Sequence, residues 1–157
     1  MNSCYDQVHL VGTADCDLRS ALLSRETARD ALATYHLDQP YANTIAVETI
    51  SLGAAVSLLN DLNWYLIRYT DASFVLEPSI SDTEWLSREL ATAVRTGEID
   101  PHESSRYLMI YGVETGDEPR LVEPMFVTRA GETIPEYDLR DVEETLAVRV
   151  TESEFGA

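Results

Sequence analysis

Residues 44–69 read TIAVETISLGAAVSLLNDLNWYLIRY, and this stretch decides the fold that we expect. It begins with β-branched residues at 44–50, which favour a strand. Ser51 is a preferred N-cap residue, and apolar residues at helical spacing follow it to about Leu62. The aromatic and branched residues at 64–69 then predict another strand. The stretch is therefore expected to form a strand, a helix and a strand.

A further strand and helix are predicted before this stretch. Residues 7–11 form a short apolar run, and Asp17 is a good N-cap for a helix. That helix should end before Gln39-Pro40, because proline disfavours helical geometry in the residue before it. Alternating strands and helices are typical of βαβ crossovers in a parallel sheet. We therefore expect an N-terminal parallel βαβαβ part, flanked by helices.

After the deciding stretch, residues 81–84 (SDTE) match a capping box that would start a helix. Ile80 and Trp85 are placed to form the hydrophobic staple that often accompanies such a box. Gly97 would end the helix, because glycine readily adopts the left-handed conformation found there.

The remaining residues predict strands. Residues 106–113 and 120–128 flank a turn and indicate an antiparallel hairpin. Pro124 lies within the second run, so that strand should be an edge strand or carry a bulge. Residues 145–150 are a last candidate strand, and residues 151–157 are expected to be frayed. The whole chain is thus expected to be one α/β domain with a mixed sheet.

The charge of the chain is its most unusual property. It has 157 residues, 28 of them acidic and 11 basic, for a formal net charge of -17. Every basic residue is arginine, and lysine is absent. Repulsion among so many carboxylates is largely screened in molar salt, where the Debye length is about 3 Å. The composition therefore predicts a protein of the cytoplasm of an extremely salt-loving organism.

Composition also bounds the partners and the chemistry. Without lysine, a Schiff-base mechanism and a Walker-type phosphate loop are excluded. Cys4 and Cys16 do not make a disulfide framework, and no secretory signal or membrane-spanning run is expected. In a halophile, net charge says little about partners. We do not expect nucleic-acid binding, because arginines and aromatics are not interleaved in a cluster. No cofactor is predicted.

The loop after the first predicted strand is the first candidate site. Residues 12–17 read GTADCD, and their place between a strand and a helix resembles that of the phosphate loop of low-molecular-weight phosphatases. Asp15 and Asp17 flank Cys16, however, and would disfavour both a thiolate and an anionic substrate. Alternatively, the two aspartates could join Asp71 to bind magnesium. The structural alternative is an N-cap Asp17 beside a semi-buried Cys16, with no metal.

A group of aromatic residues is the second candidate. Because side chains alternate across a strand, some of these residues should point away from the core and form an interaction surface. Packing against the flanking helices is the alternative. The candidates are Trp64, Tyr65 and Tyr69 on one predicted strand, and Tyr107, Tyr111 and Phe126 on the hairpin.

Four segments carry a resemblance to known proteins. They are VGTADCDLRSALLSRETARDALATY, ETISLGAAVSLLNDLNWYLIRY, SISDTEWLSRELATAVR and LVEPMF. These segments resemble those of small uncharacterised proteins from haloarchaea. The resemblance implies a halophilic origin and brings neither an activity nor site residues.

Two functions remain from the sequence. The first is a non-enzymatic interaction or regulatory protein, or an assembly subunit, that associates with a protein partner or with itself. The second is a small hydrolase or magnesium-dependent phosphoryl-binding domain that uses residues 13–17. We favour the first, because the sequence contains no recognisable catalytic motif.

Overall fold

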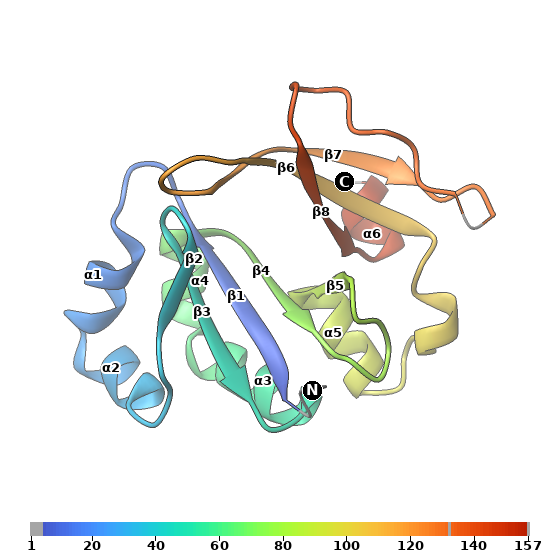
Figure 1. The fold of residues 1–157 in the computed structure, drawn as a ribbon. Coiled ribbons are helices and arrows are strands. Elements are labelled where there is room, and N and C mark those ends of the chain that lie inside the picture. Colours follow the sequence, from blue (N-terminus) through green and yellow to red (C-terminus); the bar gives the residue numbers. More distant parts are fainter. Residues whose placement is uncertain (1–4, 132, 157) are drawn as a thin grey trace.

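The computed structural model describes residues 5–131 and 133–156, which form one eight-stranded mixed sheet with helices (Figure 1). The strands are β1 (Asp6–Gly12), β2 (Asp38–Tyr41), β3 (Thr44–Thr49), β4 (Thr70–Leu76), β5 (Glu84–Ser87), β6 (Tyr107–Glu114), β7 (Arg120–Thr128) and β8 (Glu144–Arg149). The helices are α1 (Leu18–Leu23), α2 (Glu26–Leu32), α3 (Leu52–Asp61), α4 (Asn63–Tyr69), α5 (Arg88–Arg95) and α6 (Glu152–Gly156), with a 3₁₀ turn, η1 (Pro101–Glu103). The strand order is β2-β3-β1-β4-β5-β8-β6-β7.

The expected parallel βαβαβ part is wrong, because β1 pairs in antiparallel fashion with both β3 and β4. The helical connections from β1 to β2 and from β3 to β4 each join strands that lie two positions apart in the sheet. Strand β3 lies between the first pair, and β1 lies between the second pair. The short strand β2, absent from the prediction, forms a hairpin with β3. The resulting order of β1 to β4 is that of a split βαβ, ferredoxin-like unit. Among the described strands, only β5 and β8 pair in parallel.

The predicted strand at 64–69 is also wrong, because these residues form helix α4. Leu62, Tyr65 and Leu66 recur at helical spacing and are buried against the other helices of the first core cluster. Burial of this stripe therefore outweighs the preference of aromatic and branched residues for strands. The strand that pairs with β1 begins one residue later, at Thr70.

The capping box at residues 81–84 forms a turn and does not start a helix. The Ser81 hydroxyl accepts hydrogen bonds from the backbone N–H groups of Thr83 and Glu84, but the chain then enters strand β5. Trp85 lies in the second core cluster, whereas Leu86 lies in the first. Helix α5 begins only after Ser87, whose hydroxyl accepts from the N–H of Leu90.

Other local predictions are confirmed. Asp17 and Ser51 cap α1 and α3 through their side chains, and Gly97 follows α5 with φ of +82°. β6 and β7 form the predicted antiparallel hairpin, and β7 is an edge strand. The register of that hairpin shifts next to Pro124, as a bulge requires.

The expected strand at residues 145–150 corresponds to β8. Residues 152–156, within the segment that we expected to be frayed, form α6. The ring of Phe155 on α6 lies 4.9 Å from that of Tyr107 and 6.1 Å from that of Phe126, measured between centroids.

Three hydrophobic clusters make up the core. The first lies between the helices and one face of β1, β3, β4 and β5, and includes Val8, Leu10 and Val75. The second lies on the opposite face of these strands and contains Phe74, Trp85 and residues of β6 and β8. The third covers the other face of the β6–β7 hairpin. The described chain therefore buries apolar residues on both faces of its sheet.

Candidate functional site

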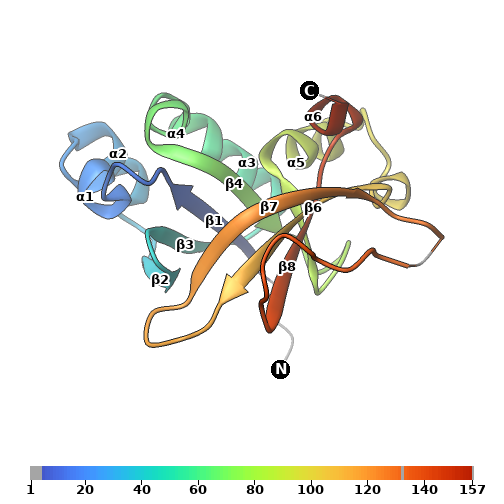
Figure 2. The ribbon, with the colours of Figure 1, turned by 90° about the horizontal axis from the view of Figure 1, so that it is seen from above.

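A long groove separates the two halves of the sheet. Its volume is about 1630 Å³, and its walls come from α4, β4 and α5 on one side and from β6, β7 and α6 on the other. The sheet curls between these walls, so that in the view of Figure 2 β7 lies between β6 and β4. One hydrogen bond, from the Ala42 N–H to the Pro119 carbonyl (2.7 Å), links the β2–β3 turn to the β6–β7 turn. Small-molecule sites usually measure about 300–1,000 Å³, so the groove is large enough for a macromolecular segment.

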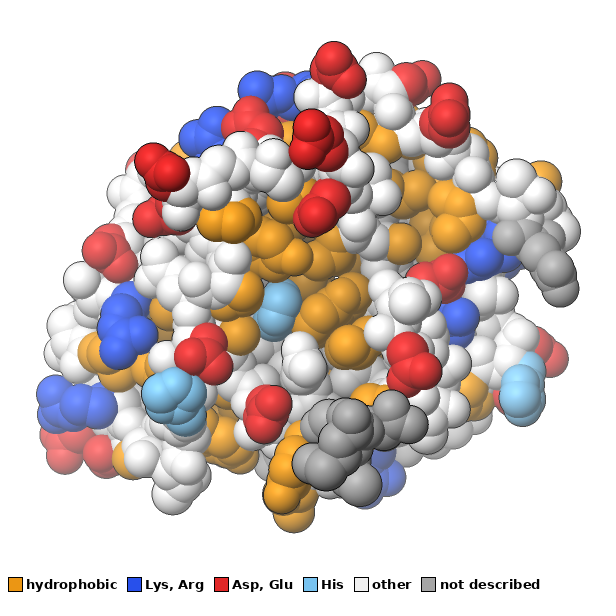
Figure 3. Space-filling view, in the orientation of Figure 1, with side chains coloured by type: hydrophobic (Ala, Val, Ile, Leu, Met, Phe, Trp, Pro, Cys, Tyr) orange, Lys and Arg blue, Asp and Glu red, His pale blue; other side chains and the backbone are white. Residues whose placement is uncertain are grey.

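The floor of the groove is apolar. Four apolar residues line the groove and also contact the second core cluster, so they form the floor of the groove. They are Val11 and Ala72 on the side of β1 and β4, and Met109 and Leu121 on the side of β6 and β7. The concave face seen in Figure 3 shows the same character, because hydrophobic side chains gather in a central hollow with carboxylates around it.

Two large hydrophobic side chains at the groove are exposed to solvent. Ile67 on α4 is 69% exposed, and Phe126 on β7 is 47% exposed. Together with the apolar floor between them, these two side chains extend the apolar surface of the groove to both of its walls.

Strand β4 presents an open edge to the groove. On one side β1 pairs with β4 along its length, but on the other side β5 pairs only with Phe74 and Val75. Residues 70–73 all line the groove. Because strand residues direct their backbone groups alternately to the two sides, some N–H and C=O groups here point to the unpaired side.

Acidic residues predominate among the charged side chains of the groove. The acidic ones are Asp71, Glu89, Glu98, Glu123, Glu152 and Glu154, and the basic ones are Arg88 and Arg120. Both arginines already have partners: Arg88 donates to Asn60, and Arg120 pairs with Glu114 at 2.7 Å. Acidic side chains therefore outnumber basic ones in the groove by six to two, close to the ratio of 28 to 11 in the whole chain.

The candidate loop at residues 12–17 is held by Asn43, a residue that the sequence did not single out. Asn43 adopts φ of +54°, in the left-handed region. Its Oδ1 accepts from the Leu18 N–H at 2.8 Å, and its Nδ2 donates to the carbonyls of Thr13 and Cys16 at 2.9 Å each. A Cβ on Gly12 would overlap the Asn43 side chain, so glycine is required here. The loop therefore connects β1 to α1 through a defined set of backbone contacts.

The three candidate aspartates have different places in the fold. Asp15 is exposed, Asp17 caps α1, and Asp71 lies in the groove. The Cys16 thiol is half-buried and contacts the Tyr69 carbonyl at 3.5 Å. Within residues 5–131 and 133–156, no three His, Cys, Asp or Glu side chains are grouped so as to hold a metal ion. Cys4 lies outside the described residues.

The structure disperses the six candidate aromatic residues. Tyr65 and Tyr111 are buried, Tyr69 and Tyr107 are half-buried, and only Trp64 and Phe126 are exposed. The guanidinium of Arg68 lies 3.8 Å from the centre of the Trp64 ring, which is cation–π geometry.

Other aromatic contacts place these residues in the core or at its edge. The Tyr69 hydroxyl accepts a hydrogen bond from Arg25. Tyr111 belongs to the second core cluster, and burial raises its pKa to about 12. Phe126 is therefore the one of the six that is both exposed and part of the groove.

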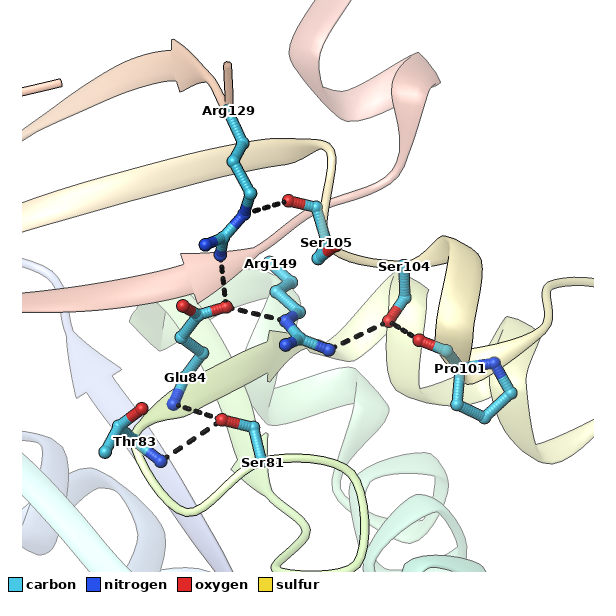
Figure 4. A network of polar contacts seen from close by, with 8 residues as sticks. All are labelled: Ser81, Thr83, Glu84, Pro101, Ser104, Ser105, Arg129 and Arg149. Carbon is cyan, nitrogen blue, oxygen red and sulfur yellow. Dashed lines mark hydrogen bonds and ion pairs between the residues drawn. The ribbon is translucent and has the colours of Figure 1, made fainter. Parts of the chain in front are cut away.

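A buried ionic network, which the sequence did not reveal, holds β5, β8 and the end of β7 together (Figure 4). One oxygen of Glu84 accepts from Arg129 at 2.5 Å and from Arg149 at 2.8 Å. Their side chains are only 13–14% exposed. These two arginines lower the pKa of Glu84, although burial alone would raise it. Arg129 also donates to the backbone carbonyl of Ser105, and Arg149 also donates to the hydroxyl of Ser104.

His9 is buried among aromatic rings of the second core cluster. Its ring centroid lies 4.2 Å from that of Trp85 and 5.7 Å from that of Phe74. Burial lowers the pKa of His9 to about 4, so the imidazole is neutral at pH 7. Among the described residues, its Nδ1 has no hydrogen-bond partner.

Comparison with known proteins identifies a family. Residues 6–113 match the model described as Family of unknown function (DUF5804), which is more than half of the chain. The chain belongs to DUF5804. The DUF5804 match extends from β1 almost to the end of β6, so it includes the wall formed by α4, β4 and α5. The β7 and α6 wall lies beyond the matched residues.

No curated protein and no solved structure matches the chain. The DUF5804 assignment confirms that it belongs to an uncharacterised family, as the resemblance implied. None of the described helices is long and apolar enough to cross a membrane.

A buried carboxyl group at the start of β1, that of Asp6, leads to a prediction about pH. Asp6 is 1% exposed, and burial together with neighbouring Glu77 raises its pKa from 3.8 to about 7. The unfolded chain releases this proton near pH 4, whereas the folded chain retains it until about pH 7. The stabilisation by neutral Asp6 is therefore complete below pH 4 and is lost as the pH rises through 7.

We expect Asp6→Asn to remove this pH dependence, because the amide stays neutral at every pH. The midpoint of thermal unfolding of D6N minus that of the wild type should increase between pH 5 and pH 8. Asp82→Asn, at an exposed position, is the matched control and should show a constant difference. Parallel curves for D6N and the wild type would contradict the assignment of a raised pKa.

Proposed function

We propose that this DUF5804 chain is a non-enzymatic interaction protein of a high-salt cytoplasm, and that it binds a partner in the groove between β4 and β7. The observation that carries the proposal is the groove itself. It combines an apolar floor, exposed Ile67 and Phe126, and an unpaired strand edge. Each of these features gains stability when a second surface covers it.

The high-salt cytoplasm is the second part of the proposal, and the charge supports it. A net charge of -17 without lysine is favourable where salt screens repulsion between carboxylates. The same screening reduces the repulsion between this chain and an acidic partner. Contacts between apolar surfaces would then contribute most of the affinity at high salt.

Site-specific photo-crosslinking in the native host tests the groove as the binding site. A photo-reactive amino acid replaces Ile67, Phe126 or, as the control, Ile50, which is 77% exposed and outside the groove. We expect a discrete cross-linked species at both groove positions and none at the control position, because only a side chain at the interface lies close enough to the partner to react.

A substitution on the floor of the groove provides a second test of the same binding site. Ala72→Glu places a charge on the apolar floor and should remove the cross-link from Phe126. Circular dichroism would verify that this variant is folded. Cross-links of equal abundance at the three positions, or none at the groove positions, would refute the proposal.

A further inference from the structure

The open edge of β4 contains no proline, unlike the edge strands β2 and β7 of the described sheet. Proteins protect exposed strand edges with short strands, prolines, charges and bulges. The edge strand β2 has only four residues and contains Pro40, and the edge strand β7 contains Pro124 next to a bulge. Residues 71–73 of β4 are Asp-Ala-Ser, with no proline, and line the groove. Asp71 carries a charge and lies at the register shift opposite Val11 and Gly12, so Ala72 and Ser73 form the regular part of this edge. Each of these residues therefore has a backbone N–H, and the N–H groups that do not point to β1 point to the unpaired side.

The curled part of the sheet resembles a barrel with one strand missing. Five strands follow one another in the order β4-β5-β8-β6-β7, and both end strands contribute to the same groove. The second core cluster fills the interior between them. An extended segment placed in the groove would pair with β4 on one side and approach β7 on the other. It would also cover the apolar floor.

The side chains of the groove indicate the chemistry of such a segment. In a strand, alternate side chains point to opposite faces. One face would contact the apolar floor formed by Val11, Ala72, Met109 and Leu121. The other face would lie near the carboxylates, which outnumber the arginines of the groove by six to two. A segment that alternates apolar and basic residues satisfies both faces.

We propose that the groove accepts an extended segment of a partner protein, with alternating apolar and basic residues, as an added strand on the free edge of β4. This inference rests on the proposed function and names the class of partner for the same groove. A second copy of this chain is a poorer occupant, because its 11 arginines lie at least four positions apart and none of its segments alternates apolar and basic residues.

Binding of synthetic peptides tests the proposal. The probe is a fluorescent peptide of about ten residues, long enough for one strand, that alternates valine and arginine. Two peptides serve as controls: one alternates valine and glutamate, and the other is the valine–arginine sequence with N-methyl groups on the backbone nitrogens of both the valines and the arginines, so that neither edge can donate hydrogen bonds. We expect each control to bind at least about tenfold more weakly in fluorescence anisotropy.

Matched protein variants separate the groove from the general acidity of the surface. Glu123→Arg reverses a charge in the groove, whereas Glu48→Arg makes the same change at an exposed position on β3. We expect Glu123→Arg to weaken binding of the basic peptide about tenfold and Glu48→Arg to change it less than about twofold. Binding should also slow the hydrogen exchange of amides in residues 71–73.

Several outcomes would overturn the inference. Equal losses in the two variants, or equal binding of the N-methylated peptide, would show general electrostatic attraction without strand pairing. Light scattering that reveals a dimer, with residues 71–73 protected and the peptide excluded, would identify a second copy as the occupant. Groove-specific cross-links in the host without peptide binding would refute the added strand while leaving the proposed function intact. Absence of both would refute the two together.

Discussion

Lowering KCl from about 2 M to about 0.1 M should lower the midpoint of thermal unfolding by about 10 °C. The Debye length increases from about 3 Å at 1 M to about 10 Å at 0.1 M, so repulsion among the 28 acidic residues reaches across the surface. A loss of about 3 kcal/mol corresponds to about 10 °C in a domain of this size. Differential scanning fluorimetry across a KCl series measures the shift.

Two controls distinguish screening from the general effect of salt on apolar burial. Sucrose strengthens burial without screening charges, so it should not replace KCl fully. A variant with four exposed carboxylates changed to amides should depend less on salt than the wild type. The positions are Glu48, Asp61, Asp82 and Glu118. Midpoints that stay constant throughout the KCl series would refute the adaptation to salt.

Removal of the Glu84 carboxylate should destabilise the fold more than any other single loss of an ion pair described above. Glu84→Ala leaves the guanidinium groups of Arg129 and Arg149 without their shared partner in a nearly buried position. Breaking a buried pair in this way costs about 3–5 kcal/mol. We expect a loss of about 3 kcal/mol, because the three side chains keep some exposure. Urea denaturation at constant high KCl measures it.

The chain contains a matched control for this variant. Glu114 also pairs with two arginines, Arg120 and Arg140, but these side chains are 59% and 41% exposed. Exposed pairs typically contribute up to about 1 kcal/mol, so Glu114→Ala should cost no more than that. Equal losses for Glu84→Ala and Glu114→Ala would contradict the special role of the buried network.

Short-range patterns in the sequence predicted the local features well. The N-caps Asp17 and Ser51 and the stop at Gly97 depend on a few neighbouring residues, and all three are confirmed. The β6–β7 hairpin is also a local structure, and Pro124 correctly indicated its edge position. The same local reasoning failed at residues 64–69, where burial of an apolar stripe decided between helix and strand.

Contacts between distant residues could not be predicted in this way. The position of β1 between β3 and β4 makes the sheet antiparallel there, although the order of elements alone was consistent with parallel crossovers. The ionic network joins Glu84 to Arg129, which is 45 positions away in the sequence, and to Arg149, which is 65 positions away. Periodicity and short motifs cover only neighbouring residues, so they do not predict contacts between residues this far apart in the sequence.

The candidate site likewise has some properties that the sequence determined and others that only the tertiary structure decided. Composition by itself predicted the acidic surface, because charge is a sum over residues and does not depend on the fold. The sequence also named Phe126 and Asp71, but for a strand surface and a magnesium loop. Only the tertiary structure placed both at one groove, because the curl of the sheet brings β7 opposite β4. The open edge of β4 has the same origin, since it exists only because β5 is too short to cover it.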